Sequence, residues 1–181
     1  MEIKDADILV KFNDPVTKVS GFNLLVEKYQ QKIYWHVRRL VIDHEDANDV
    51  VQNVFIKVWN GLENFRSESL LYTWIYRIAT NEALSFLQQK NKRASISTED
   101  EALDLNQKLK ADRYFDGDEL QVMLVKAIAS LPEKQRVVFN LRYYDEMKYE
   151  QMAEVLETSV GALKASYHHA AKKIEKFITG H

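Results

Sequence analysis

The sequence predicts an all-α fold of two small helical domains joined by a flexible linker. Only five glycines and two prolines occur in the 181 residues, as expected of a helical chain, because both residues disfavour helix interiors. Apolar residues recur at three-and-four spacing along most of the chain, which is the period of an amphipathic helix. This pattern fades between residues 94 and 117, so we place the domains at residues 1–93 and 118–181.

The N-terminal domain is expected to be a bundle of four helices. We place these helices at about residues 5–12, 21–42, 45–62 and 70–90. The second helix has an apolar stripe of Phe22, Leu25, Val26, Tyr29, Ile33, Val37 and Leu40. The third has a stripe of Ala47, Val50, Val51, Val54, Phe55, Val58, Trp59 and Leu62. Helices with such stripes can bury them against one another in a small bundle.

The C-terminal domain is expected to contain four shorter helices. The first has a stripe of Leu120, Met123, Leu124, Ala127, Ile128 and Leu131, and the second has one of Val137, Val138, Leu141 and Tyr144. A short third helix at about 148–156 precedes a long fourth one at 159–178, which Thr158 or Ser159 can cap. A short helix, a tight turn and a longer exposed helix form a helix-turn-helix domain.

The expected linker carries the negative charge of the chain. Residues 94–118 contain three Lys and Arg against seven Asp and Glu, whereas the segments before and after each carry one excess positive charge. We interpret the segment as a solvated connector. A short helix after Thr98 is an open alternative, since Thr98 and Glu101 have capping-box spacing.

Composition excludes several classes of protein. Without cysteine the chain has no disulfide framework, thiolate chemistry or zinc finger. No apolar run approaches the roughly 18 residues of a membrane-spanning helix, and the mixed, acidic N-terminus does not resemble a signal peptide. We therefore expect a cytoplasmic protein.

The fourth N-terminal helix and the loop before it have the side chains of a single-strand DNA surface. We expect its polar side to carry Thr73, Arg77, Thr80 and Asn81. Because Arg77 and Asn81 lie one turn apart, a cation and an amide can contact neighbouring nucleotides. Loop amides, hydroxyls and an aromatic ring can hold an unstacked base, and terminal basic residues can neutralise phosphates. For the rings of the set, core packing is the alternative to base stacking. The candidate residues are Asn64, Phe65, Arg66, Ser67, Trp74, Arg77, Asn81, Lys90, Lys92 and Arg93.

The outward face of the last helix is a candidate surface for duplex DNA. Small residues near its start allow close approach to a groove, and the lysines farther along suit phosphate contact. The candidates are Ser159, Gly161, Ala162, Lys164, Ala165, His168, His169, Lys172 and Lys173. A merely solvated helix face is the alternative. A metal site at the two histidines is disfavoured, because adjacent helical residues point about 100° apart and no acid lies three or four positions away.

A third candidate surface lies on the third helix, where acids and amides share one side. Its residues are Asp46, Asp49, Gln52 and Asn53. Such a face repels DNA, so it is either simply solvated or a docking surface for a basic protein partner.

Two blocks of sequence resemble bacterial RNA polymerase sigma factors of the extracytoplasmic-function group. The runs DANDVVQNVFIKVW (46–59), FR (65–66) and TWIYRIATNEA (73–83) resemble the second sigma region. The runs LPEKQRVVFNLRY (131–143) and YEQMAEVL (149–156) resemble the fourth region. The likeness covers about residues 20–93 and 119–177, in the order and at the short length of that group.

The resemblance implies a dissociable specificity subunit that binds core RNA polymerase and directs promoter-specific transcription initiation, without catalysis or a cofactor. In that family the acid and amide face docks on the clamp of the largest polymerase subunit, and the flap of the second-largest subunit is a further partner. The single-strand surface recognises the melted −10 element, and the last helix reads the −35 element as duplex DNA. The linker threads towards the RNA exit path, and an anti-sigma factor is a common partner.

Two departures from the family pattern affect the C-terminal domain. Glu157 stands at a turn where the family usually has glycine, so we expect another backbone solution there. Ala162, Ala165 and His169 stand where the family often has threonine, serine and arginine, which predicts weak base readout and more reading of DNA shape.

Two other functions fit parts of the pattern. A free-standing helix-turn-helix regulator would use the first domain for dimerisation or ligand binding, and would bind duplex DNA alone. A metal-dependent DNA-processing enzyme would need convergent carboxylates near Arg77 and Asn81, and the sequence has no such cluster there.

Overall fold

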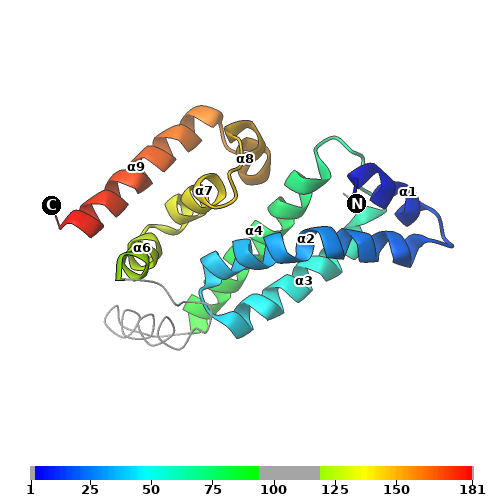
Figure 1. Cartoon of the computed structure of the whole chain (residues 1–181), viewed down its shortest axis with the longest axis horizontal. Coiled ribbons are helices and arrows are strands. Elements are labelled where there is room, and N and C mark those ends of the chain that lie inside the picture. Colours follow the sequence, from blue (N-terminus) through cyan, green and yellow to red (C-terminus); the bar gives the residue numbers. More distant parts are fainter. Residues whose placement is uncertain (1–2, 94–118, 181) are drawn as a thin grey trace.

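The computed structural model describes residues 3–93 and 119–180, and every regular element within those ranges is an α-helix (Figure 1). The N-terminal lobe contains α1 (Asp5–Asn13), α2 (Lys18–Val41), α3 (His44–Leu62) and α4 (Leu71–Arg93). The C-terminal lobe contains α6 (Glu119–Ala129), α7 (Glu133–Tyr143), α8 (Tyr149–Leu156) and α9 (Val160–Thr179). The all-α prediction is therefore confirmed. The expected linker at 94–117, with its alternative helix after Thr98, lies outside the described residues.

Local side chains account for the ends of α3 and α9. Asp43 precedes α3, and its carboxylate accepts hydrogen bonds from the N–H groups of Glu45 (2.9 Å) and Asp46 (3.1 Å). Ser159 precedes α9, and its hydroxyl accepts from the N–H of Ala162 (3.3 Å). These bonds satisfy N–H groups that the first helical turn leaves without a partner. Of the two open candidates for the α9 cap, the structure selects Ser159.

The predicted apolar stripes pack together in the core of the N-terminal lobe. On α2, α3 and α4 the buried residues recur at helical spacing, and they include Leu25, Ile33, Val37, Leu40, Ala47, Val50, Val54, Val58, Ile75 and Ala79. Helix α1 crosses α2 at Gly21, where an added Cβ would lie 2.6 Å from the backbone nitrogen of Phe12. Only glycine permits this close approach of the two helices.

A smaller cluster joins α6, α7 and α9 in the C-terminal lobe. The ring of Phe139 stacks on that of Tyr167 at 5.5 Å, beside buried Ile128 and Ile174. The expected stripe on α6 was partly wrong: Leu120 and Met123 are 60% and 43% exposed. Ala127 and Ile128, farther along the same stripe, are buried against α7 and α9, so these helices cover the last turns of α6 and leave its beginning exposed.

The two lobes also pack against each other, with α7 and α8 beside α2 and α4 (Figure 1). One hydrophobic cluster runs across the boundary between them. It contains the N-terminal core together with Val137, Val138, Leu141, Met147, Met152, Val155 and Leu163 of the C-terminal lobe. The periodicity of each helix predicted its buried side, but it did not predict this joint core.

Candidate nucleic-acid and protein interfaces

The acid and amide face of α3 points away from the helical core. Asp49, Gln52 and Asn53 are exposed. Asp46 is less accessible, with 23% of its side chain exposed, because its carboxylate forms an ion pair with Lys90 of α4. Asp46 and Lys90 were predicted for two different surfaces, and the fold brings them together.

The loop between α3 and α4 encloses an open pocket of about 240 Å³. The lining residues are Asn64, Phe65, Arg66, Glu68, Ser69, Trp74 and Arg77. The ring centres of Phe65 and Trp74 lie 5.1 Å apart. A Cβ added at Gly61 of α3 would lie 3.1 Å from the Trp74 ring, so glycine leaves room for that ring. Core packing and base stacking are therefore both compatible with Trp74, because its ring packs against α3 and also lines the pocket. The remaining loop candidate, Ser67, is exposed.

The polar side of α4 is more buried than its sequence predicts. Thr73 and Thr80, expected beside Arg77 and Asn81, are 1% and 0% exposed. Thr73 Oγ1 lies 3.0 Å from Glu154 Oε2 of α8, and Thr80 Oγ1 lies 2.9 Å from His36 Nε2 of α2. The expectation of a continuous exposed polar face was thus wrong, because neighbouring helices satisfy both hydroxyls.

Other candidates on α4 remain accessible. Asn81 is exposed, as are Lys90, Lys92 and Arg93 near the end of the helix. The side chain of Arg77 is 40% exposed and lies 3.7 Å from Glu157 at the end of α8. An exposed ion pair of this kind is weak, so it leaves the guanidinium available to a stronger anionic ligand.

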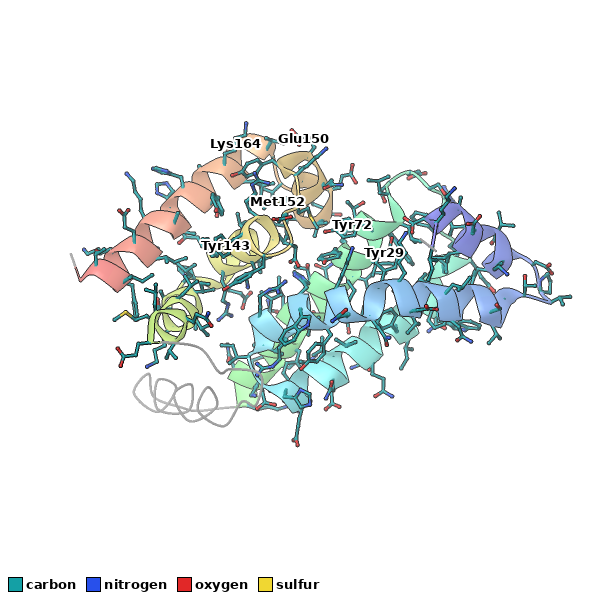
Figure 2. The ribbon with its side chains drawn as sticks, in the orientation of Figure 1. Tyr29, Tyr72, Tyr143, Glu150, Met152 and Lys164 are labelled. Atoms are coloured by element: carbon teal, nitrogen blue, oxygen red, sulfur yellow. The ribbon has the colours of Figure 1, made fainter. Side chains whose placement is uncertain are left out.

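Within the described residues, the candidate face of α9 is exposed. All nine predicted residues are exposed: Ser159, Gly161, Ala162, Lys164, Ala165, His168, His169, Lys172 and Lys173. Figure 2 shows Lys164 on the outer edge of the C-terminal lobe. Its ammonium lies 5.7 Å from the ring centre of Tyr149, and Arg142 lies 5.2 Å from the same ring. Tyr149 of α8 thus gathers two cations beside the start of α9, a contact that the sequence did not predict.

The turn between α8 and α9 corrects one expectation. Glu157 ends α8 with φ 50° and ψ 44°, which is the left-handed region. Its N–H bonds to the carbonyl of Ala153, and so does the N–H of Thr158, at 3.3 Å. We expected a different backbone conformation at this turn, but Glu157 adopts the left-handed one that glycine favours. This conformation is strained for a residue with a Cβ atom.

A buried polar cluster, which the sequence did not predict, joins the lobes at Asp145. Its carboxylate accepts a hydrogen bond from Arg39 Nη2 at 2.6 Å and lies 3.1 Å from His36 Nδ1. The hydroxyl of Tyr76 donates to it at 3.3 Å. Asp145 follows His36 by 109 residues, so no local spacing could have pointed to their contact.

Tyrosine ionisation is suppressed around this cluster. Burial, and then the charge of Asp145, raise the pKa of Tyr76, which remains a neutral donor to the carboxylate. Burial also raises the pKa of Tyr144, which lies beside Arg39. The cluster therefore holds one carboxylate among neutral and cationic donors.

A short helix, a tight turn and a longer exposed helix, as in α8 and α9, are the arrangement of a helix-turn-helix DNA-binding protein. The family model "Sigma-70 region 2" matches residues 25–93, and the model "Sigma-70, region 4" matches residues 121–174. The chain belongs to the sigma-70 family of RNA polymerase sigma factors and is of the extracytoplasmic-function type. As a sigma factor it binds core polymerase and directs promoter-specific transcription initiation, recognising −35 duplex and −10 melted DNA.

Curated relatives share most of their length with this chain. The RNA polymerase sigma-H factor of Pseudomonas aeruginosa is 36% identical over 164 residues, which cover 86% of this chain and 85% of the relative. The ECF RNA polymerase sigma-E factor of Escherichia coli K12 is 35% identical over 163 residues, with the same coverage of both chains. A free-standing helix-turn-helix regulator is therefore not favoured.

Two solved structures share the fold. CnrH in complex with the cytosolic domain of CnrY matches with a TM-score of 0.69 at 20% identity, over 97% of this chain and 95% of that one. The sigma factor RpoE in complex with the anti-sigma factor NepR, from Bartonella quintana, matches with a TM-score of 0.69 at 19% identity, over 87% and 96%. Within the described residues, no helix has the length and apolar character needed to cross a membrane.

Proposed function

We propose that this sigma factor has three binding surfaces, one for the polymerase and one for each of the two promoter elements. The polymerase surface is the α3 face of Asp46, Asp49, Gln52 and Asn53. The −10 surface consists of Asn64, Phe65, Arg66, Ser67, Trp74, Arg77, Asn81, Lys90, Lys92 and Arg93. The −35 surface is the α9 face defined above. The first two surfaces belong to a domain of residues 1–93, and the third to a domain of residues 118–181.

For the polymerase surface, the supporting observation is exposed acidic and amide chemistry on one side of α3. Asp49, Gln52 and Asn53 are exposed and project from a rigid helix. A basic partner complements such a face, and the clamp of the largest polymerase subunit is the proposed one. The flap of the second-largest subunit is the proposed partner of the C-terminal domain.

The pocket between α3 and α4 carries the −10 assignment. It combines two aromatic rings, an amide, a hydroxyl, two guanidinium groups and one carboxylate around about 240 Å³. A base taken out of the DNA stack can be held by ring stacking and by hydrogen bonds to its edge. Arg77 borders the pocket, and exposed Asn81 lies one helical turn beyond it, where the next nucleotides of the same strand would follow.

The −35 assignment rests on the exposure of one whole side of α9. Gly161, Ala162 and Ala165 make the first turns of the helix narrow, so the backbone can approach a groove closely. Lys172 and Lys173 follow on the same helix and can contact phosphates. Because few of these side chains are base-reading donors, shape readout is expected to contribute to recognition of this element.

We further propose that the protein acts without catalysis or cofactor, in the cytoplasm, where its polymerase partner works. We also place an anti-sigma factor among its partners. The support for this partner is the fold that the chain shares with RpoE, which was solved with the anti-sigma factor NepR.

Core binding followed by run-off transcription tests the proposal. Purified protein is mixed with sigma-free RNA polymerase on a library of genomic promoter fragments, and transcript starts are mapped. We expect starts that depend on this chain and share sequence elements near −35 and −10. A folded chain that neither associates with core nor supports any start would overturn the proposal.

A further inference from the structure

Exposed cations follow one side of α9 in a row that two histidines interrupt. Lys164 and Lys172 are eight positions apart, and His168 stands midway between them. Residues four positions apart lie one above the other on a helix, so these three side chains share one face. His169 is the next residue and lies one turn before Lys173. Both histidines therefore stand in the middle of the lysines of the −35 surface.

This spacing leaves a gap in the row of lysines. At the helical rise, eight residues separate Lys164 from Lys172 by about 12 Å along the axis of α9. One strand of DNA carries a phosphate about every 3.4 Å along the axis of the duplex. The gap is thus longer than the spacing of neighbouring phosphates. Charged imidazoles at the two histidine positions would make the row of cations continuous.

No acid stands close to the two rings along α9. The nearest is Glu175, six positions after His169. The ring centres of His168 and His169 lie 5.9 Å apart. The described ranges contain no group of three or more His, Cys, Asp and Glu side chains that could hold a metal ion. The rings have lysines as their charged neighbours on this helix, so the ligand that suits them is an anion.

The helices packed against α9 do not reverse this charge. Helices α6, α7 and α8 cover its buried side, and burial raises the pKa of Tyr167, the residue before His168, so that its hydroxyl stays neutral. The charged and titratable groups that face α9 from these helices are Glu119 and Lys126 of α6, Arg142 and Tyr143 of α7, and Tyr149 and Glu150 of α8. Their two carboxylates balance their two cations, so the lysines of α9 determine the sign of the potential at the two rings.

We propose that His168 and His169 form a proton-dependent binding site for the DNA backbone, so that the −35 surface takes up protons when it binds duplex DNA. The proposal rests on the −35 assignment made above. Histidine is the side chain that ordinarily changes its charge between about pH 5 and 8. A protonated ring is a cation with two N–H donors, and a phosphate oxygen accepts strongly from such a donor.

The direction of the effect follows from the charges on each side. In the free chain, neighbouring lysines disfavour a further positive charge, whereas a phosphate beside the ring favours it. Protons and DNA therefore bind to this surface cooperatively, because linkage between two ligands is reciprocal. Affinity for the −35 element rises as the pH falls and is lost as the pH rises and the rings become neutral. Promoter recognition is thereby coupled to the pH of the surrounding solution.

The pH dependence of duplex binding by the holoenzyme tests the proposal. The probe is a labelled duplex that carries the −35 element of a promoter identified by run-off transcription and ends upstream of its −10 element. Fluorescence anisotropy is measured at constant ionic strength, because phosphate contacts depend on salt. We expect wild-type holoenzyme to bind the probe about fivefold more tightly at about pH 6 than at about pH 8, which is roughly the effect of one exposed ion pair.

Three variants assign the effect to the two rings. His168→Gln combined with His169→Gln keeps polar side chains that take up no proton, so it should bind weakly at both pH values. His168→Lys combined with His169→Lys has fixed charges and should bind tightly at both. His44→Gln replaces an exposed histidine of α3, in the other lobe, and should keep the wild-type ratio of affinities. The substituted positions are all exposed, so helical circular dichroism should be retained.

Proton uptake itself provides a second measurement. Calorimetric titration of holoenzyme with the probe, in two buffers of different ionisation enthalpy at the same pH, gives the number of protons bound with the DNA. We expect a net uptake by wild type that the double glutamine variant lacks. Equal uptake by these two proteins would overturn the proposal.

The outcomes also separate the proton linkage from the −35 assignment. Equal affinity of wild type at both pH values overturns the linkage, and so does a pH dependence that persists in the double glutamine variant. Lys172→Gln combined with Lys173→Gln should weaken binding at both pH values and keep the pH dependence. Unchanged binding by this lysine variant would count against the −35 surface itself, and the proton-dependent site would be rejected with it.

Discussion

Arg77 of α4 and Glu157 of the turn before α9 lie 3.7 Å apart. Glu157 also holds a left-handed backbone conformation, with φ 50°. One residue therefore shapes the helix-turn-helix turn and contacts the helix that borders the pocket proposed to bind the −10 element. The two roles can be separated by substitution, because the backbone strain depends on the Cβ atom and the ion pair depends on the carboxylate.

Replacement of Glu157 by glycine should stabilise the fold relative to Glu157→Ala. Both variants lose the exposed ion pair, which contributes between about 0 and 1 kcal/mol. The left-handed conformation costs an alanine about 1–2 kcal/mol, partly offset by the greater freedom of glycine in the unfolded chain. We expect the free energy of unfolding by urea to be about 0.5–1 kcal/mol larger for the glycine variant. An alanine variant that is the more stable of the two would contradict the strain assigned to this turn.

Reversal of charge at Asp49 should abolish holoenzyme formation without unfolding the protein. Asp49 is exposed on the face proposed to bind polymerase, and surface substitutions change stability by about 0.5 kcal/mol or less. We expect Asp49→Lys to retain its helical circular dichroism and lose pull-down by core polymerase. Glu27→Lys makes the same change at an exposed position of α2 and should still bind. Normal core binding by Asp49→Lys would refute the assignment of this face.

Truncation of Asn81 should impair promoter opening more than polymerase binding. Its side chain is exposed on α4 and is proposed to contact the melted strand. We expect Asn81→Ala to lower the yield of permanganate-reactive thymines at the −10 element about tenfold or more, as loss of hydrogen bonds of about 1.5 kcal/mol implies. Ser85→Ala, one turn farther along at another exposed position, serves as the matched control. Equal loss of core binding and opening in Asn81→Ala would indicate misfolding instead.

The two glycines at positions 21 and 161 should respond oppositely to alanine. A Cβ at Gly21 would lie 2.6 Å from the backbone nitrogen of Phe12, so α1 must shift. We expect Gly21→Ala to lower the free energy of unfolding by about 1–3 kcal/mol. A Cβ at Gly161 meets no described atom within 4 Å, and Gly161→Ala should add up to about 1 kcal/mol of helix stability.

Thermal and urea unfolding of these two variants provide the measurement. An unchanged Gly21→Ala would disprove the close approach of α1 to α2 as the reason for glycine at position 21, and a destabilised Gly161→Ala would contradict the open space at position 161. The Gly161 variant carries a second readout, because an added methyl on the −35 surface should weaken its approach to duplex DNA in holoenzyme.

Individual helices were predictable because their signals are local. The stripe through Leu25, Ile33 and Val37 follows the helical period, and Ser159 lies at a capping position, so neighbours along the chain determine both. The same reasoning failed at Leu120 and Met123, which continue the period on α6 but precede the turns of the helix that α7 and α9 cover. It also failed at Thr73 and Thr80, because a hydroxyl gives the same sequence pattern in water and against a buried partner.

The sequence by itself determined the class of the protein, its helices and the exposed side chains of α3 and α9, because apolar spacing, caps and family motifs all act over short separations. Only the tertiary structure decided the contact of Asp145 with His36 and Arg39, the burial of Thr73 under α8 and the pairing of Asp46 with Lys90. Each of these contacts joins residues at least 44 positions apart. Their formation depends on how whole helices pack, and a local sequence pattern contains no information about contacts between residues so far apart in the chain.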